Sequence, residues 1–329
     1  MTTVKLEAGT DDAGRRLDRV LRKALPDHSL SLIHRLLRQR KIKVDDKPAR
    51  PETRVQPGAV IQIATRRTSQ EKQTCPVNET GASLEPLPEV LAKGSGIIFF
   101  CKPAGLASHG PDSLDTLVKA YYAQRPPAAS GPSISFRPGP LHRLDRSTSG
   151  AIAFSENLAG ARLFSELLRE RRVTKTYLAI VEGLVLAGTD KGSAGELSWR
   201  DILVRDKTAK KTFVVTAEGA VAKKAETTVK VIAAGNHLTL IEARIATGRT
   251  HQIRAQAAAH GHPLAGDVKY GGHAIADGVF FLHAWKIGFD LDVNGLPRLI
   301  QAPPPKAFLA RVLSTFGRDV CRQLQNNSS

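Results

Sequence analysis

The sequence is poor in cysteine and has no long apolar run. Its 329 residues include only Cys75, Cys101 and Cys321, with no C-x-x-C pair, so we expect reduced thiols and neither a disulfide framework nor cysteine-bound zinc. No apolar run approaches the about 20 residues of a membrane span, and the polar start "MTTVKLEAGTDDAGRRLD" lacks a signal-peptide core. These absences predict a cytoplasmic protein with no membrane partner.

Motifs for cofactors are missing as well. The chain has no G-x-x-x-x-G-K-[ST] loop and no G-x-G-x-x-G fingerprint, and "GTDKGSAG" has the character of a polar loop. His260 and His262 lack the spacing of an H-E-x-x-H zinc helix, which favours structural or RNA-facing roles for them over metal ligation. We therefore predict an activity that needs no cofactor and no metal.

Acidic residues are far fewer than basic ones. The 31 Asp and Glu stand against 48 Lys and Arg, a net charge of +17. Such an excess favours nucleic acid as the partner over an anionic membrane surface or an acidic protein, but does not separate DNA from RNA. The length predicts two domains, and 41% hydrophobic residues suffice for a core.

A small α/β domain is expected over residues 14–64. The pattern predicts two amphipathic helices, the first ended by Pro26 and the second capped by Ser29 or Ser31. After them, "IKVDDKPAR" predicts a hairpin that turns at Asp45 and Asp46, and "GAVIQI" predicts a closing strand. The apolar helix faces carry Leu17, Val20, Leu21 and Leu25, then Leu32, Ile33, Leu36 and Leu37. The polar face of the second helix carries Arg35, Arg38, Arg40 and Lys41. These four cations are either RNA contacts or a solvated surface.

A polar linker at 65–87 is followed by a larger domain at 88–318 and a tail at 319–329, frayed from residue 325. Strands are predicted at 97–101, 151–154, 177–181, 213–216, 227–232 and 238–245. Helices are predicted in "LAGARLFSELLRERR", with Leu163, Phe164, Leu167 and Leu168 on its apolar side, and in "THQIRAQAAAHG", which Gly261 closes. The fold class is therefore α+β, with a mixed second domain.

The stretch "GPLHRLDRSTSG" at 139–150 is the strongest candidate for chemistry. Asp145 stands between Arg143 and Arg146, whose positive field favours an ionised carboxylate. Such a group is either a nucleophile or the acid of an ion-paired loop. A Ser-His-Asp triad is disfavoured, because His142, Asp145 and Ser147 share one loop and no G-x-S-x-G elbow is present.

"HRLDRSTSG" resembles the H-R-L-D-x-x-T-S-G signature of the RluA-type pseudouridine synthases. Four further blocks match that family in order: "IIFFCKPAGLASH", "KTYLAIVEG", "ATGRTHQIRAQAAAHGHPLAGDVKYGG" and "LHAWKIGF". Together they span most of residues 96–290. The N-terminal domain similarly resembles the S4 RNA-binding domain that many of these synthases carry.

The resemblance implies a mainly antiparallel synthase sheet and an intramolecular isomerase that converts uridine in RNA to pseudouridine without a cofactor. It implies that Asp145 is the nucleophile, attacking C1′ or C6, that Tyr177 packs against the uracil, and that Arg254 pairs with Asp145. Further residues are expected at the substrate: Arg143, His142, Ile253, Lys102 and His251, with His109 along the RNA path. Thr148 and Ser149 are expected to brace the Asp145 loop through local hydrogen bonds.

Two departures from the family pattern stand out. Ser147 replaces a common Asp, and the insert "VLAGTDKGSAGELSWR" after Gly183 is expected to affect which RNA is accepted. Large-subunit (23S) ribosomal RNA is the expected substrate and a monomer the expected state. The alternatives are a transfer RNA synthase, a non-catalytic RNA-binding or ribosome-assembly protein, and an RNA hydrolase using His142 and Asp145.

Overall fold

The chain forms two units in the computed structural model, which describes residues 2–65, 86–124, 133–186, 196–216, 219, 222–275 and 278–326. Unit 1 comprises Met1–Leu87, Thr116–Gly139 and Ser155–Arg162; unit 2 comprises Pro88–Asp115, Pro140–Phe154 and Leu163–Ser329. Most of the linker expected at 65–87 lies outside the described residues. Within the described ranges, no helix has both the length and the apolar character needed to cross a membrane.

Unit 1 contains two short helices packed on a four-stranded antiparallel sheet. The helices are α1 (Leu17–Ala24) and α2 (Leu30–Arg38), and the strand order is β1-β4-β2-β3, with β1 at Thr2–Glu7, β2 at Ile42–Val44, β3 at Lys47–Pro48 and β4 at Val60–Thr65. The core takes Leu17, Val20 and Leu21 from α1, Ile33, Leu36 and Leu37 from α2, and Ile42, Ile61 and Ile63 from the sheet. The predicted apolar helix faces are therefore confirmed, because each buries its stripe against the sheet.

Local signals in this unit act as predicted. The Ser29 hydroxyl accepts a hydrogen bond from the Leu32 backbone N–H at 3.2 Å and caps α2. Helix α1 ends at Ala24, two residues before Pro26. Asp45 and Asp46 have φ of 50° and 63°, the left-handed conformation that a two-residue hairpin loop needs to match the twist of β2 and β3.

The N-terminal sheet begins earlier than the expected boundary at residue 14. Strand β1 pairs antiparallel with β4 over its whole length, from Thr2 opposite Thr65 to Glu7 opposite Val60. Leu6 and Ala8 pack against the helix core. The sheet of this unit therefore includes a strand that lies before residue 14. A six-residue strand with two apolar positions has too weak an alternation to be read from sequence, but it completes the sheet by pairing.

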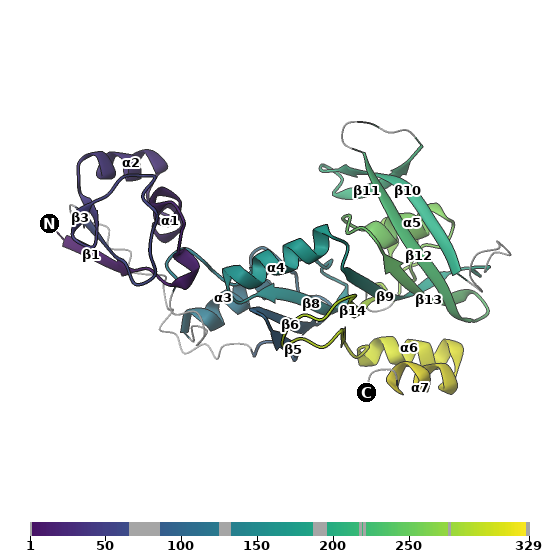
Figure 1. The fold of residues 1–329 in the computed structure, drawn as a ribbon. Helices are drawn as coiled ribbons and strands as arrows, with labels where there is room; N and C mark the ends of the chain where they lie inside the picture. The colour runs from purple at the N-terminus through teal and green to yellow at the C-terminus, as the bar shows by residue number, and fades with distance from the viewer. Residues whose placement is uncertain are drawn as a thin grey trace. The chain divides into compact units, whose positions relative to one another are not determined.

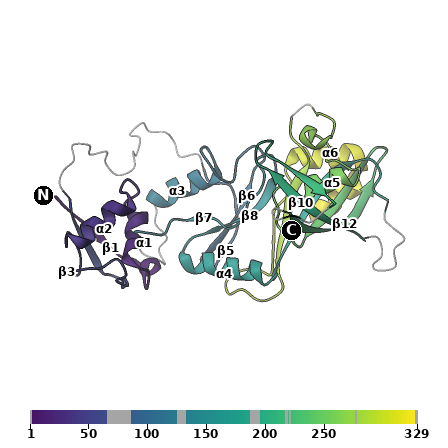
Figure 2. The same ribbon diagram turned by 90° about the horizontal axis from the view of Figure 1, so that it is seen from above.

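Unit 2 is built on a mainly antiparallel sheet. Along its path the strands run β11-β10-β12-β13-β9-β14-β8-β6-β5, with β15 paired to β14 and β7 to β8. Their bounds are β5 Val90–Gly94, β6 Ile97–Lys102, β7 Gly139–Pro140, β8 Ser149–Ser155, β9 Val173–Glu182, β10 Glu196–Asp206, β11 Lys211–Val215, β12 Lys223–Ala234, β13 Leu238–Ile245, β14 Leu282–Phe289 and β15 Leu299–Gln301. The β14–β8 pair is parallel. All six predicted strands form, and Figure 2 shows β6 and β8 at the other end of the sheet from β10 and β12.

The insert after Gly183 is only partly loop. Residues 187–195 lie outside the described residues, but "ELSWR" opens β10, which pairs with β12 from Glu196 opposite Lys230. The end of the insert therefore extends the sheet. Its expected effect on RNA choice stays a prediction.

Helices cover both faces of this sheet. On one face, α6 (Lys306–Phe316) and α7 (Arg318–Asn326) lie together and pack on Leu178 and Ile180 of β9 (Figure 1). On the other face, α5 (Gln252–Ala259) packs against Leu203 of β10 and Ala225 of β12. Since side chains alternate along a strand, Tyr177 of β9 faces away from α6 and α7.

The C-terminal tail expected at 319–329 is corrected by α7. Cys321 and Leu324 are buried with Phe308 of α6. Helix α7 ends at Asn326, and 327–329 lie outside the described residues. The polar character of "RDVCRQLQN" hid a helix that is mostly exposed and packs against α6 through two buried positions.

The remaining helices were partly anticipated. Helix α4 (Leu158–Arg169) forms within the predicted "LAGARLFSELLRERR", and its Phe164 and Leu167 are buried with Ile97 and Phe99. Helix α3 (Leu114–Gln124) and the 3-10 turns η1 (Thr10–Asp12) and η2 (Val268–Tyr270) were not predicted. Short segments of this kind carry little periodicity of their own.

Candidate active site

The Asp145 loop joins β7 to β8 and is held from both sides by the K-P-x-G segment. Before Asp145, the Ser108 hydroxyl bonds both the carbonyl and the N–H of Leu144, at 2.8 and 3.1 Å. After it, Arg146 Nε donates to the Gly105 carbonyl at 2.8 Å, and the Gly105 N–H donates to the Arg146 carbonyl at 2.9 Å. The loop is therefore fixed in place while the Asp145 side chain stays 23% exposed.

Lys102 lies beneath this loop and not on an RNA path, which corrects its expected contact with substrate. Its side chain is fully buried, and its ammonium donates to the carbonyls of Pro103, Leu106 and Arg146 at 2.9, 2.7 and 3.2 Å. Burial lowers the pKa of Lys102 to about 8, against a raising effect from Asp145. All three donors are used to join the two loops, so none is left for RNA.

The expected local bonds of Thr148 and Ser149 are also corrected. The Ser149 hydroxyl lies 2.9 Å from Nδ1 of His283, far away in sequence, and the buried Thr148 Oγ1 has no hydrogen-bond partner among the described residues. Gly150 follows with φ of 112°; a Cβ there would lie 2.1 Å from the Ala284 carbonyl oxygen of β14. The T-S-G end of the motif thus serves the close β8–β14 pairing.

Arg254 reaches Asp145 from the buried side of α5. Its Nη1 donates to Asp145 Oδ2 at 2.9 Å, while Nε and Nη2 form a two-pronged pair with Asp267 at 2.7 and 2.8 Å. The predicted pairing of Arg254 with Asp145 is present in the geometry. Asp267, 1% exposed, had no assigned role, although it lies in the "GHPLAGDVKYGG" part of the fourth block. It orients the guanidinium so that one N–H remains for Asp145.

Aromatic rings surround the same guanidinium. The Arg254 Cζ lies 4.8 Å from the centre of the Tyr270 ring and 4.3 Å from that of Phe280. These contacts replace the water that Arg254 loses, so its 7% exposed side chain stays charged at low cost.

His251 begins α5 in a left-handed conformation, with φ of 53°. Its Nδ1 lies 2.9 Å from the Tyr270 hydroxyl and 3.3 Å from Arg205 Nη1. Because arginine can only donate, Nδ1 is the acceptor and the proton of the neutral ring is on Nε2, which lies 3.7 Å from Asp145 Oδ1. Burial lowers the pKa of His251 to about 4 despite the opposing effect of Asp145.

Tyr177 is placed by β9 on the same side of the sheet as α5. Its ring is 7% exposed, and burial, followed by the charge of Asp145, raises the pKa of its hydroxyl. The neutral phenol is therefore favoured. Lys175, two residues earlier on the same face, is half-buried, and the loss of water around its ammonium lowers its pKa.

These groups line one cavity of about 1210 Å³ within unit 2. Its wall includes Asp145, Tyr177, His251 and Arg254, together with the expected Arg143, His142 and His109. Among the described residues that line it, the ten Lys and Arg are Arg143, Arg146, Arg169, Arg171, Lys175, Arg205, Lys210, Arg249, Arg254 and Lys269, and Asp145 is the one acidic residue. Such a cavity attracts a polyanion and presents it with a single carboxylate.

A smaller pocket of about 60 Å³ adjoins Asp145. Thr148, Tyr177 and Ile253 line it together with Asp145 and Arg254. Ile253 is 4% exposed and supplies apolar wall. The pocket is thus apolar on one side and charged on the other.

His142 is less accessible than its expected substrate contact requires. Its Nε2 accepts the Ala153 N–H at 3.0 Å, and its ring stacks on Phe164 at 6.0 Å. Burial, followed by the charge of Lys175, lowers its pKa to about 3. The ring is a neutral brace at the cavity wall, which argues against an RNA hydrolase that uses it as an acid–base group.

Buried neutral histidines predict a loss of stability in mild acid. His142 and His283 have pKa values lowered by burial to about 3 and about 4, so between about pH 6.5 and these values only the unfolded chain binds the protons. The free energy of unfolding is therefore highest above pH 6.5. It declines as pH falls, by about 2 kcal/mol per ring at pH 5. Urea unfolding at pH 7.5 and pH 5 measures the difference.

The variant His283→Gln should reduce that pH difference, whereas His237→Gln, at an exposed residue, should leave it unchanged. Equal stability of the unchanged protein at the two pH values would contradict the prediction.

The remaining predicted residues fall into two groups. Arg35, Arg38 and Arg40 are exposed and Lys41 is half-buried at the α2 end of unit 1, as a solvated or an RNA-binding face requires. His260 stacks on Trp199 and lies 3.1 Å from Asp201, and His262 Nδ1 lies 3.0 Å from the Glu182 carbonyl oxygen, which are structural roles. Over the described part of the chain, no group of three His, Cys, Asp or Glu is placed to hold a metal ion.

Comparison with known proteins matches both parts of the chain to families. Residues 96–259 match the RNA pseudouridylate synthase family and residues 15–61 the S4 domain. A curated ribosomal large subunit pseudouridine synthase C from Pasteurella multocida is 31% identical over 311 residues, covering 91% of this chain and 89% of that protein. The enzyme of the same name from Escherichia coli K12 is 32% identical over 314 residues, covering 92% and 93%.

Solved structures agree on the fold. The human RNA pseudouridylate synthase domain containing 4 superposes with a TM-score of 0.54 at 19% identity, over 68% of this chain and 91% of that one. The human domain containing 1 protein gives 0.53 at 23% identity, over 74% and 95%. With five motif blocks, an Asp–Arg pair in a cationic cavity and relatives that match nearly end to end, the chain belongs to the RluA-type RNA pseudouridine synthases and carries an N-terminal S4 domain.

Proposed function

We propose that this enzyme isomerises uridine in large-subunit ribosomal RNA, with Asp145 as nucleophile. The observation that carries the chemistry is the 2.9 Å bond from Arg254 to Asp145, the one carboxylate among the described residues of a strongly cationic cavity. The choice of RNA is supported by relatives named ribosomal large subunit synthases that match about nine-tenths of the chain. The exposed α2 cations of the S4 domain supply a further surface for RNA.

The roles of the site residues follow from where they lie. The target base leaves the RNA stack, at a cost of a few kcal/mol. Asp145 bonds either to C1′, displacing N1, or to C6, after which the N1–C1′ bond breaks. The base turns and C5 bonds to C1′, while the bond between Asp145 and the substrate breaks and restores the carboxylate. The C5 proton is then lost to solvent, and N1 takes up a proton, so the reaction is a net isomerisation. Arg254 aims the carboxylate, and Arg143, exposed on the wall of both pockets, holds the flipped-out nucleotide.

Tyr177 is proposed as the flat surface against the uracil. Its neutral phenol is favoured by burial and by Asp145, so stacking suits it better than service as a phenolate base. When Asp145 bonds to the substrate, the carboxylate charge that helps to raise the pKa of Tyr177 is lost. Burial, the larger cause of the raised pKa, remains. Ile253 completes the apolar side of the small pocket.

Thr148 supplies a further prediction at this pocket. Its buried hydroxyl lacks a partner among the described residues and lines the pocket with Asp145, so a polar group of the uracil is its proposed partner. Thr148→Val keeps the shape and removes the unpaired hydroxyl; we expect stability to rise by about 1 kcal/mol and kcat/KM to fall about tenfold. Thermal unfolding and tritium release measure the two effects.

Thr148→Ser keeps the hydroxyl and serves as the matched control, with most of the activity retained. Unchanged kcat/KM in Thr148→Val would show that the hydroxyl has no partner in the substrate.

Mapping pseudouridines in RNA from a strain that lacks the protein tests the choice of substrate. We expect one or more large-subunit ribosomal pseudouridines to disappear, and to return with the unchanged gene but not with Asp145→Asn. Loss of a transfer RNA pseudouridine instead would favour the transfer RNA alternative. Rescue of every growth defect by Asp145→Asn would favour a non-catalytic assembly role.

We further propose that the enzyme acts as a monomer in the cytoplasm, where ribosomal RNA is made. Light scattering of the purified protein measures its mass directly.

A further inference from the structure

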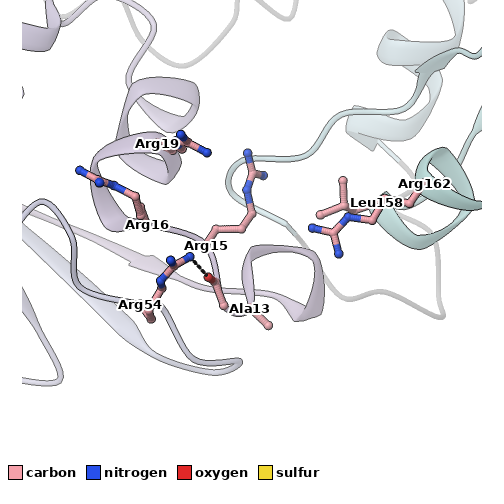
Figure 3. A pocket seen from close by; sticks show the side chains of 8 residues that line it. Ala13, Arg15, Arg16, Arg19, Arg54, Leu158 and Arg162 are labelled. Carbon is pink, nitrogen blue, oxygen red and sulfur yellow. Dashed lines mark hydrogen bonds between the residues drawn. The ribbon is translucent and has the colours of Figure 1, made fainter. Parts of the chain in front are cut away.

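A second concentration of positive charge lies in unit 1 and shares no residue with the Asp145 cavity of unit 2. A pocket of about 490 Å³ is lined by Ala13, Gly14, Arg15, Arg16, Arg19, Arg54, Leu158 and Arg162 (Figure 3). We call it the arginine pocket. Five of these eight residues are arginine, and among the described residues that line it none is acidic.

Four of the arginines are brought together at the start of α1. Arg15, Arg16 and Arg19 flank the first turn of the helix, and Arg54 is brought opposite by an antiparallel bridge between Arg16 and Arg54. Arg54 Nη1 donates to the Gly14 carbonyl at 2.8 Å, drawn as the dashed line in Figure 3. The cluster is thus a built feature of the fold.

Helix α4 contributes Arg162 to the arginine pocket, and contacts with the N-terminal segment hold the start of α4 in place. The Asp11 carboxylate accepts the Leu158 N–H at 3.0 Å and caps α4, one turn before Arg162. The adjacent Asp12, fully buried, accepts the N–H groups of Ile134 and Ser135 at 2.9 and 3.0 Å. Figure 3 shows the side chains of Arg15 and Arg162 extending into the same space.

Most of this charge is not neutralised within the described residues. Arg16 pairs with Asp18, with its Nη2 2.8 Å from Oδ2. Arg15 and Arg54 bond neutral oxygens, those of Ser135 and Gly14. The guanidinium groups of Arg19 and Arg162 make no hydrogen bond to any described residue.

Asp11 is the carboxylate that most nearly balances the pocket. It interacts electrostatically with Arg15 and Arg162, yet burial raises its pKa and it already accepts the Leu158 N–H. Arginines gathered around one such group repel one another, and an added anion removes that cost. Guanidinium forks match the oxygens of a phosphate in geometry as well as charge.

We propose that the arginine pocket binds a backbone phosphate of the substrate RNA. Arg162 lies outside the matched S4 segment at 15–61, so the pocket is not a property of the S4 domain alone. The site would hold RNA that flanks the modified uridine, since it shares no residue with the Asp145 cavity. The inference rests on the RNA substrate of the proposed function but not on which RNA is modified.

The test replaces the two arginines whose guanidinium groups make no hydrogen bond to a described residue, as Arg19→Gln with Arg162→Gln. Binding of a substrate RNA fragment to the full chain should weaken about tenfold, with the slope of log Kd against log salt reduced by about one, as for one lost phosphate contact. The kcat at saturating RNA should not change, because neither residue lines the Asp145 cavity.

The matched control is Arg318→Gln with Arg322→Gln. It removes the same two charges from exposed positions on α7 that line neither pocket. The control should change Kd less than about twofold. Equal weakening of RNA binding in both double variants would overturn the proposal, because the overall positive charge would then account for the loss. Unchanged binding in the pocket variant would also overturn it, because the two arginines would then make no contact with RNA.

A second measurement needs no variant. Inorganic phosphate added to the unchanged chain should shift the Nε–H signals of the pocket arginines in NMR spectra, and RNA should displace it. Phosphate binding that RNA does not displace would assign the pocket to a free anion and overturn the RNA role. If the unchanged chain bound the RNA through this pocket but converted no uridine, the proposed isomerase function would be contradicted. The proposal that the arginine pocket binds an RNA phosphate would still hold.

Discussion

Replacing Asp145 with asparagine is expected to abolish tritium release from C5-labelled uridine in RNA, lowering the rate by at least about 10,000-fold, as the loss of a covalent nucleophile does. An amide has no charge with which to attack carbon. It retains an oxygen at the position that accepts Arg254 Nη1, so the local packing should survive. Turnover of a labelled substrate RNA, measured in single-turnover conditions, gives the comparison.

RNA binding by Asp145→Asn should be equal to or tighter than that of the unchanged chain, because removing the carboxylate leaves the cationic wall of the cavity intact. The exposed Asp112→Asn is the control and should keep full activity. Normal turnover by Asp145→Asn would mean that another group is the nucleophile.

Replacing Asp267 with asparagine is expected to impair both folding and catalysis. Asp267 is 1% exposed and holds the Arg254 fork through two hydrogen bonds. Removing its charge leaves a buried guanidinium partly uncompensated, which typically costs about 3–5 kcal/mol. Because the fork also aims the third N–H at Asp145, kcat should fall about 100-fold with a small change in KM. Urea unfolding and steady-state kinetics measure the two losses.

An exposed ion pair provides the control for this variant. Asp292 and Arg298 have side chains that are 80% and 64% exposed. Asp292→Asn should therefore leave both the urea midpoint and kcat close to those of the unchanged chain. An Asp267→Asn enzyme with normal kcat would show that Arg254 is aimed by its aromatic neighbours without Asp267.

The N-terminal unit shows how far local signals reach. The Ser29 cap, the break before Pro26 and the left-handed pair Asp45–Asp46 act within a few residues, so the sequence pattern predicted each of them. Strand β1 and helix α7 were missed. Each has few buried residues of its own and is stabilised by a partner distant in sequence, β4 for the strand and α6 for the helix.

In the active site, the residue types and the motif order pointed to Asp145, Tyr177 and Arg254, and the structure brings all three to one cavity. The same reasoning placed Lys102 at the substrate, where burial makes it a support for the loop. His142 does line the cavity, with its Nε2 bonded to the Ala153 N–H, and its contact with substrate stays a prediction. The same reasoning also gave Ser149 a local bond in place of its contact with His283. A motif letter does not say whether a polar side chain faces the cavity or the core.

By itself, the sequence determined the chemistry class through its resemblance to the RluA-type synthases, which five ordered blocks carry. Its positive charge and the missing cofactor motifs narrowed the partner and the chemistry but left the role of Asp145 open. Only the tertiary structure decided which further groups support Asp145 and its predicted partner Arg254. Asp267 orienting Arg254, the unpaired Thr148 hydroxyl and the meeting of Arg162 with the α1 arginines all depend on contacts between segments far apart in the chain. Such contacts are made by packing and pairing over distance, and they leave no periodicity or spacing in the sequence.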